Sequence, residues 1–292
     1  DTSMGTLVVV FPYDICHQRQ PVPPAFGLPV LLTTAVALGV VAVNRDMTVE
    51  AFVGMVVAAV VSTAATVAAR RWPAMTPLAQ RLLDFKLKLA HDTSCSSRAC
   101  AKGPDRAITV GKLHDLLAFF QDFIRDRTAY YLDSNVTVRL TKEKNLSYSE
   151  FVGPTGVEWF VSHFWGTAFS HFCAALRKHA ETVCGARSWT ELPYWVCFCS
   201  NNQHLIGDEL GGGWQESSFY VTLMSGRCHG TCMVLDDEAL PLTRTWCIFE
   251  LLQTIKLERT DNHFQGLLFC TSGGVLNTGS GSVEVAMALA KK

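Results

Sequence analysis

The chain of 292 residues has little charge of either sign. Asp, Glu, Lys and Arg together make up 17% of it, and the formal net charge is −1. A nearly neutral chain has no overall electrostatic field that would attract nucleic acid or an acidic membrane surface. We therefore expect no nucleic-acid partner. The mean hydropathy of +0.19 is apolar for a soluble protein, and the apolar excess is concentrated between residues 26 and 69.

The sequence also lacks a disulfide framework. It has 11 cysteines, an odd number, and their spacings follow no disulfide pattern. Several of them lie in apolar runs, where a free cysteine behaves as a small buried hydrophobe. This usage is typical of a reducing compartment such as the cytosol, a matrix or a stroma. The chain begins at Asp1, which fits either a processed mature form or a piece of a longer protein.

Charge is absent altogether from residues 26–43 and from residues 51–69, runs of 18 and 19 residues. As helices rising about 1.5 Å per residue, each would be roughly 27–29 Å long, which is close to the thickness of a bilayer's hydrocarbon core. The short polar link at residues 44–50 makes the two helices antiparallel neighbours. Residues 26–71 are therefore predicted to form a transmembrane hairpin. The alternative is two buried helices of a soluble core.

Most of the positive charge lies outside the hairpin loop, which carries only Arg45 against Asp46 and Glu50, and this predicts the orientation of the hairpin. Five basic residues follow the second run, namely Arg70, Arg71, Arg81, Lys86 and Lys88. By the positive-inside rule both termini lie on the cytoplasmic, stromal or matrix side, and a plastid or mitochondrial membrane is consistent with this. The spans contain no ionisable side chain, so we expect an anchor in the lipid bilayer rather than an ion path.

Small residues recur every four positions on the second run, at Gly54, Ala58, Ser62 and Thr66. Such spacing lets helix backbones approach closely in a membrane. This face could contact its hairpin partner or another subunit. We therefore expect the hairpin to embed the chain in a larger membrane complex.

The rest of the chain divides by its pattern. Residues 1–25 form an N-terminal segment, residues 72–150 a helical connector, and residues 151–292 an α/β domain. In the connector, Thr76 is predicted to cap a helix that starts at Pro77, and a second helix is predicted over residues 110–131. Residues 136–140 are predicted to form a short strand.

Strand-like and helix-like segments alternate from Val157 onward. Predicted strands cover residues 157–164, 194–199, 231–235 and 266–270, and predicted helices cover residues 167–183, 217–224, 243–257 and 282–290. This alternation is typical of a parallel sheet with helices on both faces. Ligands of such sheets bind beyond the carboxyl ends of the strands.

Metal sites are not predicted, because no group of potential ligands is complete. Cys95 and Cys100 have no second pair at zinc spacing, and neither do Cys228 and Cys232. The acidic run at residues 236–238 is interpreted as a solvated strand end rather than a magnesium site. The polar run at residues 201–204, with Asp208 and Glu209, is interpreted as a loop.

Three blocks in this domain occur in a specific order and spacing. They are Trp-Phe-Val-Ser-His-Phe-Trp-Gly at residues 159–166, Tyr-Trp-Val-Cys at 194–197 followed by Asn-Asn-Gln-His at 201–204, and Leu-Thr-Arg-Thr-Trp-Cys-Ile-Phe-Glu-Leu at 242–251. With these blocks, residues 146–270 resemble a divergent TIR-like family found in dinoflagellates and other algae. The resemblance implies a flavodoxin-like parallel sheet.

The same resemblance implies site residues. In enzymatic TIR domains the Glu of the Trp-Cys-x-x-Glu-Leu element is the catalytic acid of NAD⁺ cleavage, and here it is Glu250. Ser162, His163, Trp165, Arg244 and Trp246 would then surround the nicotinamide ribose. A carboxylate at that point could stabilise the oxocarbenium character of the ribose. Each of these residues also has a purely structural interpretation, since many TIR domains only dock other proteins.

Two features depart from the TIR pattern. The loop at residues 201–215 is long and contains three successive glycines, and no final fifth strand is evident. We therefore expect a membrane-anchored TIR-like interaction module, an accessory subunit of a larger membrane complex; no cofactor is certain, and NAD⁺ is the one candidate. The alternative is a membrane-tethered NAD⁺ glycohydrolase that uses Glu250.

Overall fold

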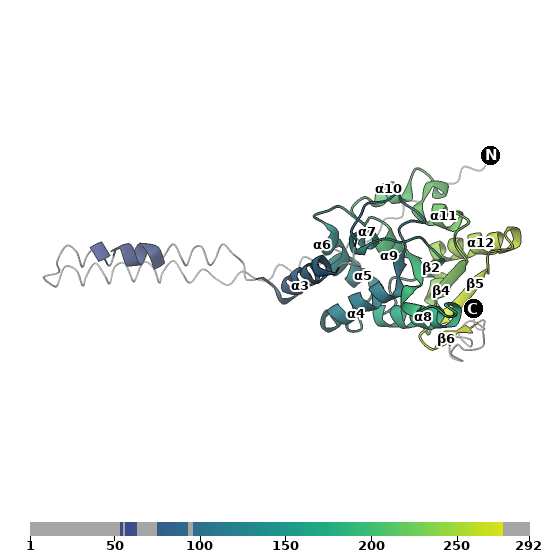
Figure 1. Cartoon of the computed structure of the whole chain (residues 1–292), viewed down its shortest axis with the longest axis horizontal. Coiled ribbons are helices and arrows are strands. Elements are labelled where there is room, and N and C mark those ends of the chain that lie inside the picture. Colours follow the sequence, from purple (N-terminus) through teal and green to yellow (C-terminus); the bar gives the residue numbers. More distant parts are fainter. Residues whose placement is uncertain (1–52, 55, 63–74, 93–95, 277–292) are drawn as a thin grey trace. The chain divides into compact units, whose positions relative to one another are not determined.

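The computed structural model describes residues 53–54, 56–62, 75–92 and 96–276, and it divides the chain into two compact units, residues 1–74 and 75–292 (Figure 1). The described residues of the first unit are helical and exposed. The N-terminal segment 1–25, the predicted span 26–43, most of the span 51–69 and the predicted helix 282–290 lie outside the described residues. None of the helices that can be described has both the length and the apolar character needed to cross a membrane.

The second unit is built on a mixed six-stranded sheet with the order β1-β3-β2-β4-β5-β6. The central strands β3, β2, β4 and β5 are parallel to one another. The strands are β1 (Ile108–Thr109), β2 (Trp159–His163), β3 (Pro193–Val196), β4 (Gly230–Val234), β5 (Leu267–Thr271) and β6 (Gly274–Val275). The prediction of an α/β fold is confirmed, and all four predicted strands of the domain are present.

The sheet is not wholly parallel, because both edge strands run antiparallel to their neighbours. At one edge a two-residue turn joins β5 directly to β6, with Thr271 paired to Gly274. A connection this short can only join antiparallel strands. Gly274 has a φ of 149°, a conformation that favours glycine.

Helices cover both faces of the sheet. Figure 1 shows α4 and α8 along one side of the strands and α11 and α12 along the other. The larger hydrophobic cluster lies under α4 and α8, and two smaller clusters lie on the α11 and α12 side. The helices are α3 (Pro77–His91), α4 (Val110–Ile124), α5 (Ala129–Leu132), the π-helix η1 (Asp133–Thr137), α6 (Val138–Thr141), α7 (Tyr148–Val152), α8 (Phe169–Val183), η2 (Trp189–Glu191), α9 (Cys197–Ser200), α10 (Ile206–Leu210), η3 (Trp214–Glu216), α11 (Ser218–Leu223), η4 (Leu240–Thr243) and α12 (Thr245–Thr260).

The segment expected as a connector belongs to the same compact unit as the α/β domain. Its strand β1 pairs with β3, and its helix α4 packs against α8. The predicted cap of α3 is confirmed, because the Oγ1 of Thr76 accepts a hydrogen bond from the backbone N–H of Ala79 at 3.2 Å. Helix α4 begins at the predicted Val110. It ends at Ile124 rather than at residue 131, because Arg125 takes a φ of 47°.

Two predicted strand segments are helical instead. Residues 136–140 lie in η1 and α6, where the Oγ1 of Thr137 donates back to the carbonyl and the carboxyl of Asp133. The second predicted strand ends at Val196 rather than at residue 199, because residues 197–200 form α9. There the backbone N–H of Val196 donates to the Oγ of Ser200 at 3.1 Å, which stabilises the turn out of the sheet.

Candidate functional site

Ser162 and Glu250 meet between the sheet and α12. Successive side chains of a strand point to opposite faces, so Ser162 shares the face of Phe160, which packs in the cluster beside α11 and α12. The Oγ of Ser162 donates to Oε2 of Glu250 at 2.6 Å. Both residues are buried, with Glu250 4% exposed. The structure thus brings together Ser162 and Glu250, which are 88 positions apart in the sequence, and a third predicted site residue, Trp246, also hydrogen-bonds to the Glu250 carboxyl.

Burial changes the acid chemistry of Glu250. Removal from water disfavours the carboxylate and raises its pKa from 4.5 to about 8, although hydrogen bonds from Ser162 and Trp246 act in the opposite direction. At neutral pH the side chain is therefore mostly a neutral acid. Because the carboxyl is 4% exposed and accepts the hydrogen bond from Ser162, it is not open to a nicotinamide ribose in this arrangement.

Trp246 is only partly buried, with 43% of its surface exposed. Its ring packs edge-on against Phe219 of α11, with 4.6 Å between the ring centroids. Arg244 is exposed and immediately precedes α12, and its guanidinium lies 5.0 Å from the ring centroid of Phe164.

Trp165 is half-buried and directs its indole N–H to the Sγ of Cys197, 3.0 Å away. The carboxyl of Glu250 is close enough to help raise the pKa of the Cys197 thiol, although burial is the larger cause. Cys197 was predicted only as a small buried residue of the second strand. Its position beside Trp165 depends on the turn into α9, for which the sequence pattern gave no signal.

His163 lies on the opposite face of the sheet from Glu250. Its ring packs against Phe172 and Phe198, with centroids 4.6 and 5.6 Å away. Neither ring nitrogen has a hydrogen-bond partner, and burial lowers the pKa of the imidazole to about 3. His163 is therefore a neutral core residue, separated from Glu250 by the sheet. The predicted site is divided between two faces.

Helix α12 has an unusual distribution of side chains. Its buried positions include three polar residues, Glu250, Gln253 and Thr254. Its exposed positions include Ile248 and Leu252, which are 42% and 47% exposed and lie one turn apart on the same side. Surface helices of globular proteins normally show the reverse arrangement. The outer face of α12 is therefore a candidate contact surface.

A buried ionic cluster lies elsewhere in the unit and was not predicted. Arg106 contacts Oε1 of Glu150 at 3.3 Å and Oε1 of Glu209 at 2.5 Å, and the three side chains are 12%, 2% and 4% exposed. Glu150 also completes a capping box with Ser147 at the start of α7. The Glu209 carboxylate accepts the backbone N–H of Asn202 at 3.2 Å. The cluster therefore ties the loop before β1 to α7 and to the long loop after β3.

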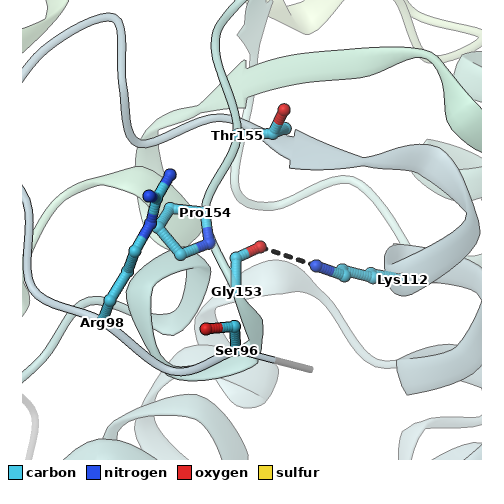
Figure 2. Close-up of a pocket in the computed structure, with 6 residues that line it drawn as sticks. All are labelled: Ser96, Arg98, Lys112, Gly153, Pro154 and Thr155. Atoms are coloured by element: carbon cyan, nitrogen blue, oxygen red, sulfur yellow. Dashed lines mark hydrogen bonds between the residues drawn. The ribbon is translucent and has the colours of Figure 1, made fainter. Parts of the chain in front are cut away.

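A hollow of about 260 Å³ lies at residues 153–155, just after α7. Figure 2 shows the six residues that line it. Its lining includes two basic residues, Arg98 and Lys112, but Nζ of Lys112 donates to the carbonyl oxygen of Gly153 at 2.6 Å. None of its lining residues is among the predicted site residues. The hollow is thus a surface feature distinct from the Ser162–Glu250 pair.

Comparison of the chain with protein-family models, with curated proteins and with solved structures gave no match. The TIR-like resemblance therefore rests on the sequence blocks and not on these comparisons.

Proposed function

We propose that this chain is a TIR-like interaction module that a hairpin at residues 26–71 anchors in a membrane, where the module docks another subunit of a membrane complex. The main support is the outward apolar face of α12, at Ile248 and Leu252. The order of the parallel strands, β3-β2-β4-β5, is also that of the first four strands of a flavodoxin-like sheet, which is the fold that the TIR-like resemblance implies.

The partner surface that suits this face is apolar and of the size of a helix. Ile248 and Leu252 are spaced four residues apart, which is the spacing at which a partner helix or groove takes up anchoring side chains. Charge contributes little here, because the chain as a whole is nearly neutral. The proposed partner is therefore a membrane subunit with an apolar helix or groove on the same side of the bilayer.

Substitution of this face tests the proposal. The double variant Ile248→Asp/Leu252→Asp is expected to lose at least ten-fold in association with its partner complex, because burying two carboxylates in an apolar interface is costly. The measurement is the fraction of the protein that co-migrates with larger membrane complexes after mild detergent solubilisation.

The matched control is Arg177→Asp/Lys178→Asp on α8, at exposed positions on the other side of the sheet. It introduces the same number of carboxylates and is expected to co-migrate like the wild type. Equal co-migration of all three proteins would contradict the proposed docking face.

The alternative function, NAD⁺ cleavage, predicts that the protein releases nicotinamide from NAD⁺ and that this release depends on Glu250. Glu250, the residue that would act, is 4% exposed and mostly protonated at neutral pH. We expect purified protein to release nicotinamide from NAD⁺ no faster than buffer alone, and we expect Glu250→Gln to behave identically. Release by the wild type that is at least ten-fold above the Glu250→Gln rate would establish the glycohydrolase and displace the scaffold.

A further inference from the structure

Three potential metal ligands converge inside the core, on the face of the sheet that α8 covers. They are His179 on α8, Cys232 on β4 and Cys270 on β5, and one ligand atom from each lies within 4.8 Å of the others. All three side chains are 0% exposed. Because they come from three separate elements, no spacing in the sequence could have indicated them.

The register of the sheet explains why the two cysteines meet. On the parallel strands β4 and β5, Cys232 is opposite Leu268 and Val234 is opposite Cys270. The cysteines are thus offset by two residues, so both point to the face that α8 covers. Their sulfur atoms lie 3.2 Å apart.

One ring nitrogen of His179 is hydrogen-bonded and the other is not. Its Nδ1 lies 2.5 Å from the hydroxyl oxygen of Tyr194, and its ring packs edge-on against Trp159 with centroids 4.4 Å apart. Its Nε2 is buried and has no hydrogen-bond partner. An unpartnered nitrogen in the core is unfavourable unless something else satisfies it. In metal sites a histidine commonly uses one nitrogen as ligand while its other N–H is fixed by a hydrogen bond, and Tyr194 supplies such a bond here.

We propose that His179, Cys232 and Cys270 bind a divalent, thiol-seeking metal ion of the zinc class. Two thiolates and a neutral imidazole around a divalent ion sum to zero charge, which suits a site closed to bulk solvent, and a neutral fourth ligand would leave that sum unchanged. A monovalent ion such as Cu⁺ would leave one negative charge in the core, which is costly to bury.

Metal binding would require the ligand atoms to move. Zinc–sulfur bonds of about 2.3 Å at tetrahedral angles place two thiolates about 3.8 Å apart, so the sulfurs, now 3.2 Å apart, would separate by roughly 0.6 Å. The three ligand atoms lie within 4.8 Å of one another, so the imidazole of His179 would also have to approach the sulfurs. The ion would join α8 to the two strands β4 and β5. The fourth position would be left for a small exogenous ligand, since the described residues contribute three ligands from His, Cys, Asp and Glu to this cluster.

Because the site is closed, the metal must enter while the chain folds. The full chain should therefore be expressed in zinc-supplemented medium, purified with a non-chelating reductant and analysed by elemental mass spectrometry. We expect about one zinc per chain. Protein produced with cobalt instead should show thiolate-to-metal charge-transfer absorption in the near ultraviolet.

Cysteine variants test which residues bind the metal ion. Cys232→Ala and Cys270→Ala should each lower the metal content at least ten-fold, whereas Cys173→Ala should leave it unchanged. Cys173 is the matched control because it is a fully buried cysteine of α8 outside the cluster. Circular dichroism shows whether each variant folds. The cobalt spectrum of the wild type tests metal binding even if a variant fails to fold.

Three results would overturn the proposal. One is wild-type protein without stoichiometric zinc or a cobalt–thiolate band. Another is equal metal content in the wild type and in folded Cys232→Ala. The third is a disulfide between Cys232 and Cys270 in freshly prepared protein, detected as two fewer titratable thiols under denaturing conditions.

Discussion

Replacing Arg106 with alanine is expected to lower the free energy of unfolding by about 3–5 kcal/mol, because it removes the cation from a buried ion cluster. Glu150 and Glu209 would then remain buried beside each other without a positive partner. The carbonyl oxygen of Cys100 would also lose the two guanidinium hydrogen bonds that it accepts at 2.8 and 3.1 Å. Such a loss is a large part of the stability of a typical domain. Urea denaturation of the full chain in mild detergent, followed by tryptophan fluorescence, measures it.

Arg227→Ala is the matched control for this variant. Arg227 forms an ion pair of 2.7 Å with Asp105, but both side chains are about half exposed, at 43% and 55%. Solvent screens such a pair, so its loss should cost less than about 1 kcal/mol. Similar losses in the two variants would show that the Arg106 cluster is not buried as described.

Replacing Glu250 with glutamine is expected to stabilise the protein at alkaline pH and to leave its stability near pH 5 little changed. The folded protein keeps the Glu250 proton up to a pKa of about 8, whereas an unfolded chain releases it near 4.5. The stability that this group contributes is therefore present below pH 4.5 and is lost as the pH rises to 8. Glutamine resembles the neutral acid and does not titrate, so the variant should lack this loss between pH 4.5 and 8, which is of the order of several kcal/mol.

His163 has the opposite pH dependence. Its pKa in the folded protein is about 3 against an ordinary 6.5, so its contribution is lost as the pH falls from 6.5 to 3. Between pH 4.5 and 6.5 the effects of Glu250 and His163 oppose each other. Asp133, with a pKa raised from 3.8 to about 7 by burial, adds to the decline between those two pH values. The unfolding midpoint of the wild type should thus decrease from pH 6.5 to 8.5.

Glu258→Gln is the control, because it makes the same substitution at an exposed position of the same helix. Its unfolding midpoint should follow that of the wild type from pH 5 to 9. A Glu250→Gln variant that loses stability above pH 7 as steeply as the wild type would mean that Glu250 is already ionised in the folded protein.

Sequence patterns predicted the parts of the fold that depend on local order. Apolar runs predicted both ends of β2, β4 and β5 to within two residues, and the Thr76-Pro77 pair predicted the start of α3. They failed where tertiary packing overrides local preference. The β-branched run Val136-Thr137-Val138 favours a strand, but these residues continue a buried helical segment.

The candidate site was predictable only in part. The resemblance identified Ser162 and Glu250, which do meet, but the alternation of β2 places His163 on the other face of the sheet. Sequence position alone cannot show that α12 turns Glu250 inward and Leu252 outward. The Arg106–Glu209 contact joins residues 103 positions apart, and such long-range pairs leave no periodic signal.

The measurement that tests the interaction module most directly is the size of the native wild-type protein after gentle solubilisation from its own membrane. Blue-native electrophoresis followed by detection of this chain is expected to show it in a complex several times heavier than its own 32.1 kDa plus bound detergent. Migration only as a free small protein, across several mild detergents, would contradict the account.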